Sequence, residues 1–123
     1  MQRRDINAAD APAPAGQYTQ AIEVTGANRT LYLSGQVSIG SDGSVPEDAE
    51  AQCALAWRNL QVQLRAAGME VENLVKITTI VRDPADVAKV RAGRAAVLRA
   101  HKPASTLTWM SHTRADPHGE RGR

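Results

Sequence analysis

The chain has 123 residues and a hydrophobic fraction of 42%, which predicts a single domain with its own core. Aromatic residues make up only 3% and Phe is absent, so this core must consist mainly of aliphatic side chains. The net charge of +2 and the scattered Lys and Arg residues argue against nucleic-acid binding. The single Cys excludes an intramolecular disulfide and favours the cytoplasm. We expect neither a signal peptide nor a membrane-spanning run.

The first third of the chain is expected to be extended. Residues 1–17 contain Pro and Gly and cannot continue a helix, so 1–13 are predicted to form an N-terminal arm. Alternation over 18–24 and again over 31–37, with a turn between them, predicts a β-hairpin. Gly35 weakens the second strand unless a ligand or another backbone approaches it closely. The alternative is a β-bulge, with Ser34 and Gln36 as solvated polar neighbours.

A long helix is predicted next. Ser44 to Glu47 resembles a capping box, and the helix should end near Ala67, just before Gly68. Its apolar stripe has helical spacing and includes Cys53, which is expected to act as a small hydrophobe rather than a reactive thiol. The members of the stripe are Ala49, Cys53, Ala56, Leu60 and Leu64, with Trp57 at the edge.

The second half repeats strand, helix and strand. Residues 74–81 are rich in β-branched side chains and predict a strand parallel to an earlier one. Asp83 and Pro84 should begin a helix. The buried face of this helix is predicted to be Val87, Val90, Val97 and Leu98, and its solvent side Arg91, Arg94 and Arg99.

An alternative for the three arginines is a phosphate-binding cluster.

Residues 105–110 alternate as a final strand, and 111–123 read as a polar tail without periodicity. The order β-β-α-β-α-β predicts an α+β domain with a mixed sheet and both helices on one face. The uncovered face is expected to pack against other copies of the chain.

The residues alone offer no strong catalytic motif. There is no Gly-rich phosphate loop, no HExxH and no paired-Cys spacing, so no metal site is expected and the catalytic residues stay unknown. His101, His112 and His118 are too irregularly placed to suggest metal ligands.

The order of several short segments resembles the RidA/YjgF family, also called the L-PSP endoribonuclease family. These segments are Gly16-Gln-Tyr-Thr-Gln-Ala21, Leu33-Ser-Gly-Gln36, Asn59-Leu60, Ala67-Gly68, Val75-Lys-Ile-Thr78, Asp83 and Pro103-Ala-Ser105, within residues 14–110. The resemblance implies a chorismate-mutase-like fold and a homotrimer with sites in clefts between subunits. It also implies cofactor-free hydrolysis of small enamines and imines to 2-keto acids and ammonia.

The resemblance also implies which residues bind the ligand. Tyr18 falls on the tyrosine that closes the pocket, although a packed hairpin Tyr remains an alternative. The backbone of Ser34 and Gly35, beside Gln36, is expected to approach the ligand. Ser105 stands where active members carry an arginine that holds the substrate carboxylate.

Two further positions of the family differ in this chain. Arg91 stands near the family's helix asparagine, with Arg94 one turn on. Either can supply a displaced positive charge, and a solvated helix face is the alternative. The family's C-terminal strand glutamate has no counterpart here, and Glu120 is not assigned that role.

Three functional hypotheses follow from this pattern. The first is an arginine-lacking family member that binds a small metabolite, with weak or no deaminase activity. The second is an active 2-iminopropanoate/2-iminobutanoate deaminase that uses a helix arginine. The third is an RNA-acting or chaperone-like interaction protein, although the scarcity of aromatic residues argues against stacking on RNA bases.

Overall fold

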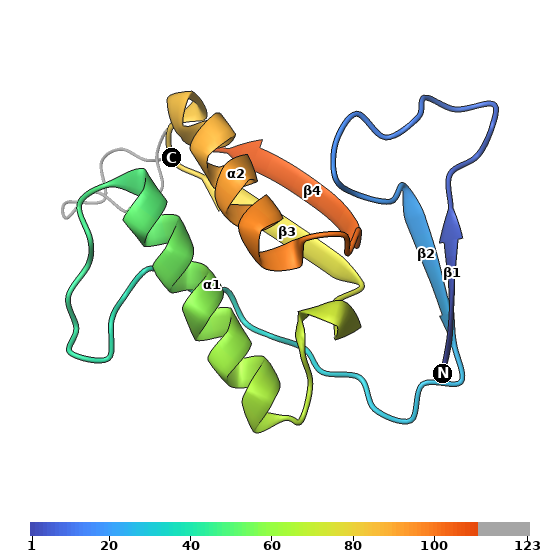
Figure 1. Cartoon of the computed structure of the whole chain (residues 1–123), viewed down its shortest axis with the longest axis horizontal. Helices are drawn as coiled ribbons and strands as arrows, with labels where there is room; N and C mark the ends of the chain where they lie inside the picture. The colour runs from blue at the N-terminus through green and yellow to red at the C-terminus, as the bar shows by residue number, and fades with distance from the viewer. Residues whose placement is uncertain (111–123) are drawn as a thin grey trace, which may run out of the picture.

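The computed structural model describes residues 1–110, and the predicted polar tail lies outside them. The elements in chain order are β1 (Gln2–Ile6), β2 (Ala21–Thr25), α1 (Ala49–Ala66), the 3-10 helix η1 (Val71–Asn73), β3 (Lys76–Val81), the 3-10 helix η2 (Pro84–Asp86), α2 (Val87–Leu98) and β4 (Ala104–Trp109) (Figure 1). This arrangement confirms the predicted α+β class. Neither of the described α-helices is long and apolar enough to span a membrane.

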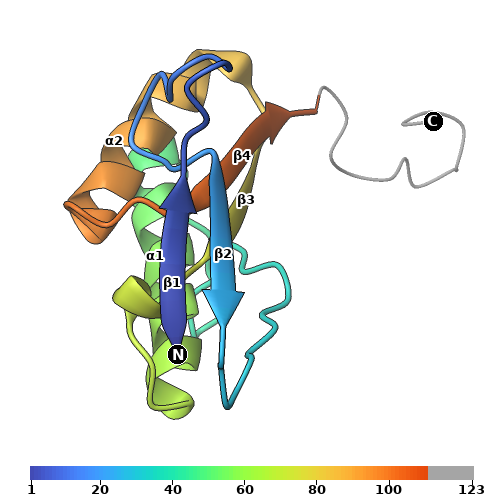
Figure 2. The ribbon, with the colours of Figure 1, turned by 90° about the vertical axis from the view of Figure 1, so that its right-hand side faces the viewer.

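The centre of the fold is a parallel pair of strands covered by two helices. β3 and β4 pair from Lys76 opposite Ala104 to Val81 opposite Trp109. Both α-helices lie on the same side of this pair (Figure 2). The core that results joins Trp57 from α1, Ile77 from β3 and Leu98 from α2. The helical periodicity of the apolar residues therefore correctly predicted the two helices that form this layer.

The N-terminal residues, expected only to be an extended arm, contain a strand at Gln2–Ile6 that the sequence analysis did not predict. β1 pairs antiparallel with β2, with Gln2 opposite Thr25 and Ile6 opposite Ala21. Both strands are largely exposed, which explains why β1 lacks the apolar alternation that would reveal it in the sequence. The hairpin lies beside the β4 edge of the central pair (Figures 1 and 2).

Residues 31–37 are not a strand, so the predicted second strand of the hairpin is wrong. The segment instead lies along α1, where Nδ2 of Asn59 donates hydrogen bonds of 2.9 Å to the carbonyls of Val37 and Ile39. Ser38 Oγ donates to the carbonyl of Gln52 over 2.7 Å. Asn59 of α1 thus satisfies two carbonyls that a strand partner would otherwise occupy, and Ser38 bonds in turn to the backbone of α1. Within residues 1–110, β3 therefore pairs with the later strand β4 rather than with an earlier one.

The N-cap of the first helix lies four residues after the start of the predicted capping box. Asp48 is the N-cap, and its carboxylate accepts a hydrogen bond of 2.7 Å from the backbone N–H of Ala51. Ser44 instead donates to Asp42 Oδ1 over 2.7 Å within the preceding turn. The predicted end near Ala67 is confirmed, and Gly68 adopts the left-handed conformation with φ +72°.

The second helix begins as the sequence predicts, with one difference. Asp83 accepts a hydrogen bond of 2.9 Å from the backbone N–H of Ala85. The first turn, Pro84–Asp86, is 3-10, and the α-helix proper starts at Val87.

Candidate functional site

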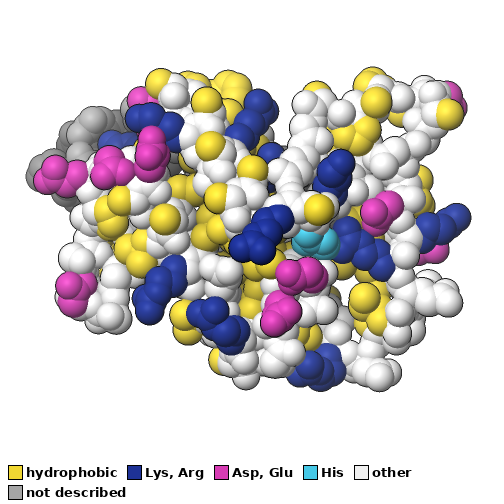
Figure 3. All heavy atoms as spheres, viewed as in Figure 1, with side chains coloured by type: hydrophobic (Ala, Val, Ile, Leu, Met, Phe, Trp, Pro, Cys, Tyr) yellow, Lys and Arg dark blue, Asp and Glu magenta, His cyan; other side chains and the backbone are white. Residues whose placement is uncertain are grey.

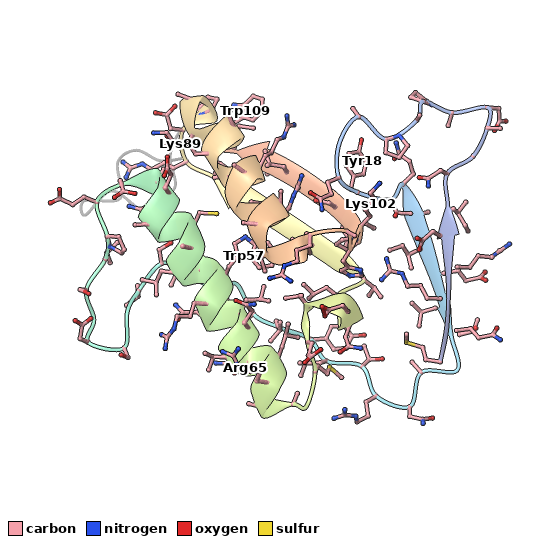
Figure 4. All side chains as sticks on the ribbon, in the orientation of Figure 1. Tyr18, Trp57, Arg65, Lys89, Lys102 and Trp109 are labelled. Atoms are coloured by element: carbon pink, nitrogen blue, oxygen red, sulfur yellow. The ribbon has the colours of Figure 1, made fainter. Side chains whose placement is uncertain are left out.

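The start of β4 is joined to the loop that connects β1 and β2. Thr19 is only 3% exposed and forms a parallel bridge with Ala104. Its N–H donates to the carbonyl of Pro103 over 3.1 Å, and its hydroxyl donates to the carbonyl of Lys102 over 2.6 Å. These bonds fix the Tyr18 segment beside the start of β4, and Figure 4 shows Tyr18 next to Lys102.

Tyr18 itself is half-buried and bends back over its own loop. The N–H of Ala15 donates a hydrogen bond of 3.3 Å to its hydroxyl oxygen. A phenolic hydroxyl that accepts one bond can still donate its own proton. Tyr18 therefore keeps a donor available in the loop beside the start of β4.

A guanidinium reaches Ser105 from the second helix. Nη1 of Arg94 donates a hydrogen bond of 3.1 Å to Oγ of Ser105. Arg94 is 7% exposed, so its predicted place on the solvent side of α2 is wrong. Arg91, the helix arginine predicted to bind the ligand, is exposed.

The sequence contains a signal for the burial of Arg94. This residue lies four positions after Val90 and four before Leu98, so it continues the apolar stripe of α2. Charged residues are rarely fully buried, and composition therefore pointed to the solvent side. Periodicity was the better guide at this position.

The electrostatic environment of Arg94 is unusual for a buried cation. Its Nε is buried and has no hydrogen-bond partner among the described residues. The ion pairs found within residues 1–110 are Arg3–Asp5 and Arg4–Glu23, so no carboxylate in this part of the chain pairs with Arg94. Burial lowers the pKa of Arg94, and the neighbouring charge of Arg91 lowers this pKa further. The guanidinium is thus shielded from solvent without an anion from the described residues.

Residues 34–36, the segment predicted to approach the ligand, do not contact β4 through hydrogen bonds within residues 1–110. Nε2 of Gln36 donates to the carbonyl of Ser34 over 3.1 Å, and no hydrogen bond joins residues 34–36 to β4 within the described chain. A side chain added at Gly35 would meet no atom within 4 Å. Packing within one described chain therefore does not require glycine at this position. The structure joins Arg94 to Ser105 and places Thr19, next to Tyr18, beside Ala104, but it does not bring Ser34, Gly35 or Gln36 to them.

The other polar features among residues 1–110 include a surface hollow and a free thiol. A polar hollow lies at the opposite end of the strand pair from Ser105 and is lined by Glu47, Ala49, Gln52, Arg82, Asp83, Pro84 and Asp86. Residues 1–110 contain no group of three His, Cys, Asp or Glu side chains placed to hold a metal. Burial raises the pKa of the Cys53 thiol, which favours the unreactive protonated form.

Comparison with known proteins places this geometry in context. The family model described as Endoribonuclease L-PSP matches residues 8–113. A RutC family protein of Aquifex aeolicus is 37% identical over 81 residues, covering 65% of this chain and 62% of the relative. The 2-iminobutanoate/2-iminopropanoate deaminase of mouse is 38% identical over 90 residues, covering 72% of this chain and 64% of the relative. The chain therefore spans less than two thirds of the length of these two relatives.

The solved structures include a similar fold. A protein of the conserved Rid family from Yersinia pestis, YyfB, matches with a TM-score of 0.78 and 29% identity. The match covers 95% of this chain and 91% of that one. YyfB is itself described as a protein of unknown function.

Proposed function

Because the chain belongs to the RidA/YjgF family, we propose that it binds a small imine- or keto-acid-like metabolite at the start of β4. The observation that carries this proposal is the convergence of Ser105 with the Tyr18 loop, which is fixed there by the hydrogen bonds of Thr19. Both positions are the ones that the family resemblance assigns to ligand binding. We place the protein in the cytoplasm, where reactive imines released by pyridoxal-phosphate enzymes would be encountered.

The reaction that this site would serve is hydrolysis of a 2-imino acid. The oxygen of a water molecule adds to the imine carbon, and the C–N bond of the resulting carbinolamine then breaks. Ammonia leaves and a 2-keto acid remains, with no change in oxidation state and no cofactor consumed. Ser105 offers a neutral hydroxyl where a guanidinium would hold the carboxylate in a charge-assisted pair, so we expect weak classical activity.

A second candidate, active imine deamination, is favoured by one specific observation. A guanidinium does reach Ser105, but it belongs to Arg94 of α2 rather than to β4. If this displaced charge holds the substrate carboxylate, turnover does not require an arginine at position 105. The mouse relative carries the name of a 2-iminobutanoate/2-iminopropanoate deaminase, which gives the chemical class of such a substrate.

A homotrimer with its sites in clefts between subunits is part of the proposal. Large apolar side chains remain exposed on a single described chain, including Ile80 at 59% and Trp109 at 55%. Within residues 1–110 the second edge of β3 has no strand partner, and parallel sheets are normally covered on both faces. Association of copies would bury these surfaces and could bring residues 34–36 of one subunit toward β4 of another.

Nucleic acid is a less suitable ligand than a small acid. Basic side chains are interspersed with acidic and apolar ones on the face in Figure 3, rather than gathered into a stripe. Phosphate-backbone binding requires a concentrated positive surface.

The experiment that tests the function has two readouts on the full chain. Isothermal titration with 2-oxobutanoate measures binding of the keto-acid product class, and keto-acid release from enzymatically generated 2-aminoacrylate measures turnover. Binding with slow turnover supports the metabolite-binding proposal, whereas rapid turnover favours the deaminase alternative. Absence of both binding and turnover would reject both candidates. Sedimentation velocity of the same sample tests the trimer, and a monomer at micromolar concentration contradicts it.

A further inference from the structure

The guanidinium of Arg94 has more donors than the described chain satisfies. Arginine carries five N–H donors and no acceptor. Within residues 1–110 the only hydrogen bond to Arg94's side chain is the one from Nη1 to Ser105 Oγ, while Nε is buried without a partner. Buried charges in proteins are normally paired with an opposite charge. Among the described residues, no group supplies the negative charge that such a buried guanidinium normally pairs with.

We infer that Arg94 is the residue that binds the carboxylate of the ligand, a small 2-imino or 2-keto acid, and that Ser105 orients it. This inference rests on the proposed function for the identity of the ligand. The positive charge is thus delivered from α2, and β4 contributes a serine hydroxyl instead of an arginine.

The geometry of the guanidinium suits this role. With Nη1 engaged by Ser105, the edge formed by Nε and Nη2 is left, and no hydrogen bond joins this edge to the described residues. Its two parallel N–H bonds match the two oxygens of a carboxylate in a bidentate pair. Because Nε is now buried, the side chain must shift slightly about its bond to Ser105 when the anion binds.

Ser105 has a second contribution in this arrangement. Its Oγ accepts the bond from Arg94, so its own O–H remains a donor that can point toward the anion. A small side chain at position 105 also leaves space that a second arginine would fill. Ser105 therefore positions Arg94 and offers one further donor, while Arg94 is the group that pairs with the charge of the ligand.

The test measures binding of 2-oxobutanoate and of its neutral analogue 2-oxobutanamide to the full chain and its variants. The parent should bind the acid more tightly than the amide, by roughly tenfold or more, because the amide cannot form a charge-assisted pair. Arg94→Met should lower affinity for the acid by about tenfold or more and leave the weak binding of the amide unchanged. Arg94→Lys keeps the charge but loses the planar pair of donors. Its affinity for the acid should therefore lie between those of the parent and of Arg94→Met.

The matched control is Lys89→Met, which removes an exposed cation from the same helix. It should change the affinity by less than about twofold. A third variant, Asp116→Asn with Glu120→Gln, removes the two side-chain carboxylates that the sequence holds outside the described residues. If this double variant changes the melting temperature by as much as Arg94→Met does, a carboxylate of the chain itself pairs with Arg94. The inference is then wrong.

The outcomes separate the inference from the function on which it rests. If Arg94→Met binds the acid as the parent does, or Arg91→Met loses binding in its place, Arg94 is not the anion site and the proposed function stands. If the parent ignores 2-oxobutanoate but binds acetate through Arg94, the anion site stands and the proposed ligand is wrong. If the parent binds no carboxylate at all, both fail. A melting curve for each variant distinguishes lost binding from lost fold.

Discussion

The hydroxyl of Thr19 donates a hydrogen bond of 2.6 Å to the carbonyl of Lys102, a residue 83 positions later in the chain. Thr19→Val keeps the shape of the side chain and removes this donor. We expect the free energy of unfolding to fall by about 1 kcal/mol, since Arg3 still donates to the same carbonyl over 3.2 Å. Urea denaturation measures the change, and Thr19→Ser, which keeps the hydroxyl, should lose less. Equal losses in the two variants would show that the methyl group, not the hydrogen bond, matters.

Ser105→Arg is expected to impair the protein rather than restore an active family member. A second guanidinium at position 105 would lie against the buried charge of Arg94. At short range and intermediate dielectric, two like charges cost on the order of 2–4 kcal/mol. Combining Ser105→Arg with Arg94→Met should recover stability and raise keto-acid release from 2-aminoacrylate above that of the single variant. A gain of activity in Ser105→Arg alone would show that Arg94 moves away without cost.

Gly93 and Cys53 should be coupled across the contact between α1 and α2. A Cβ placed at position 93 would lie 2.7 Å from the Sγ atom of Cys53, closer than side chains normally approach. Gly93→Ala gains helix propensity but must displace this sulfur. We therefore expect Gly93→Ala to be more favourable in a Cys53→Ala background than in the parent, by roughly 1 kcal/mol in a double-mutant cycle. A coupling energy near zero would mean that Cys53 simply rotates away.

The position of the first N-cap gives a direct test of the fold against the sequence pattern. Asp48→Ala removes the acceptor for the N–H of Ala51 and should cost about 1 kcal/mol of the free energy of unfolding. Ser44→Ala should cost only a few tenths of a kcal/mol, because Ser44 bonds to exposed Asp42 and not to the helix. Thermal or urea unfolding of the two variants compares them. A larger loss of stability in Ser44→Ala than in Asp48→Ala would show that Ser44 caps the helix, as the sequence pattern predicts.

The helices and the central strands are predictable because their signals are local. Stripes of apolar residues identify α1 and α2, and β-branched residues identify β3. The local pattern does not predict which strands pair with one another. β1 has no apolar alternation. Residues 31–37 alternate well yet form no strand, and at their end Asn59 of α1 rather than a neighbouring strand bonds the carbonyls of Val37 and Ile39.

The candidate site was only partly accessible from the sequence. Ser105 is predicted from the family resemblance. The sequence predicts the other two parts of the site, the Tyr18 loop and Arg94, less well. The Tyr18 loop was predicted to be near the ligand, but the Thr19 bonds that hold it join residues too distant in sequence for any local pattern to reveal. Arg94 was assigned to solvent by its charge, although its spacing from Val90 and Leu98 indicates the buried stripe.

The attachment of the N-terminal hairpin has a consequence for the order of folding. Nη2 of Arg3 donates to the carbonyl of Lys102 across 99 residues of chain, and its Nη1 donates to the carbonyl of Leu74 over 3.4 Å. Contacts of such long range close large loops and therefore form late. During synthesis β1 leaves the ribosome before β4, yet the contact of Arg3 with Lys102 can form only after the segment before β4 has emerged. The β1–β2 hairpin is thus made before β4 but docks late, and loss of Arg3 should hasten unfolding more than it slows folding.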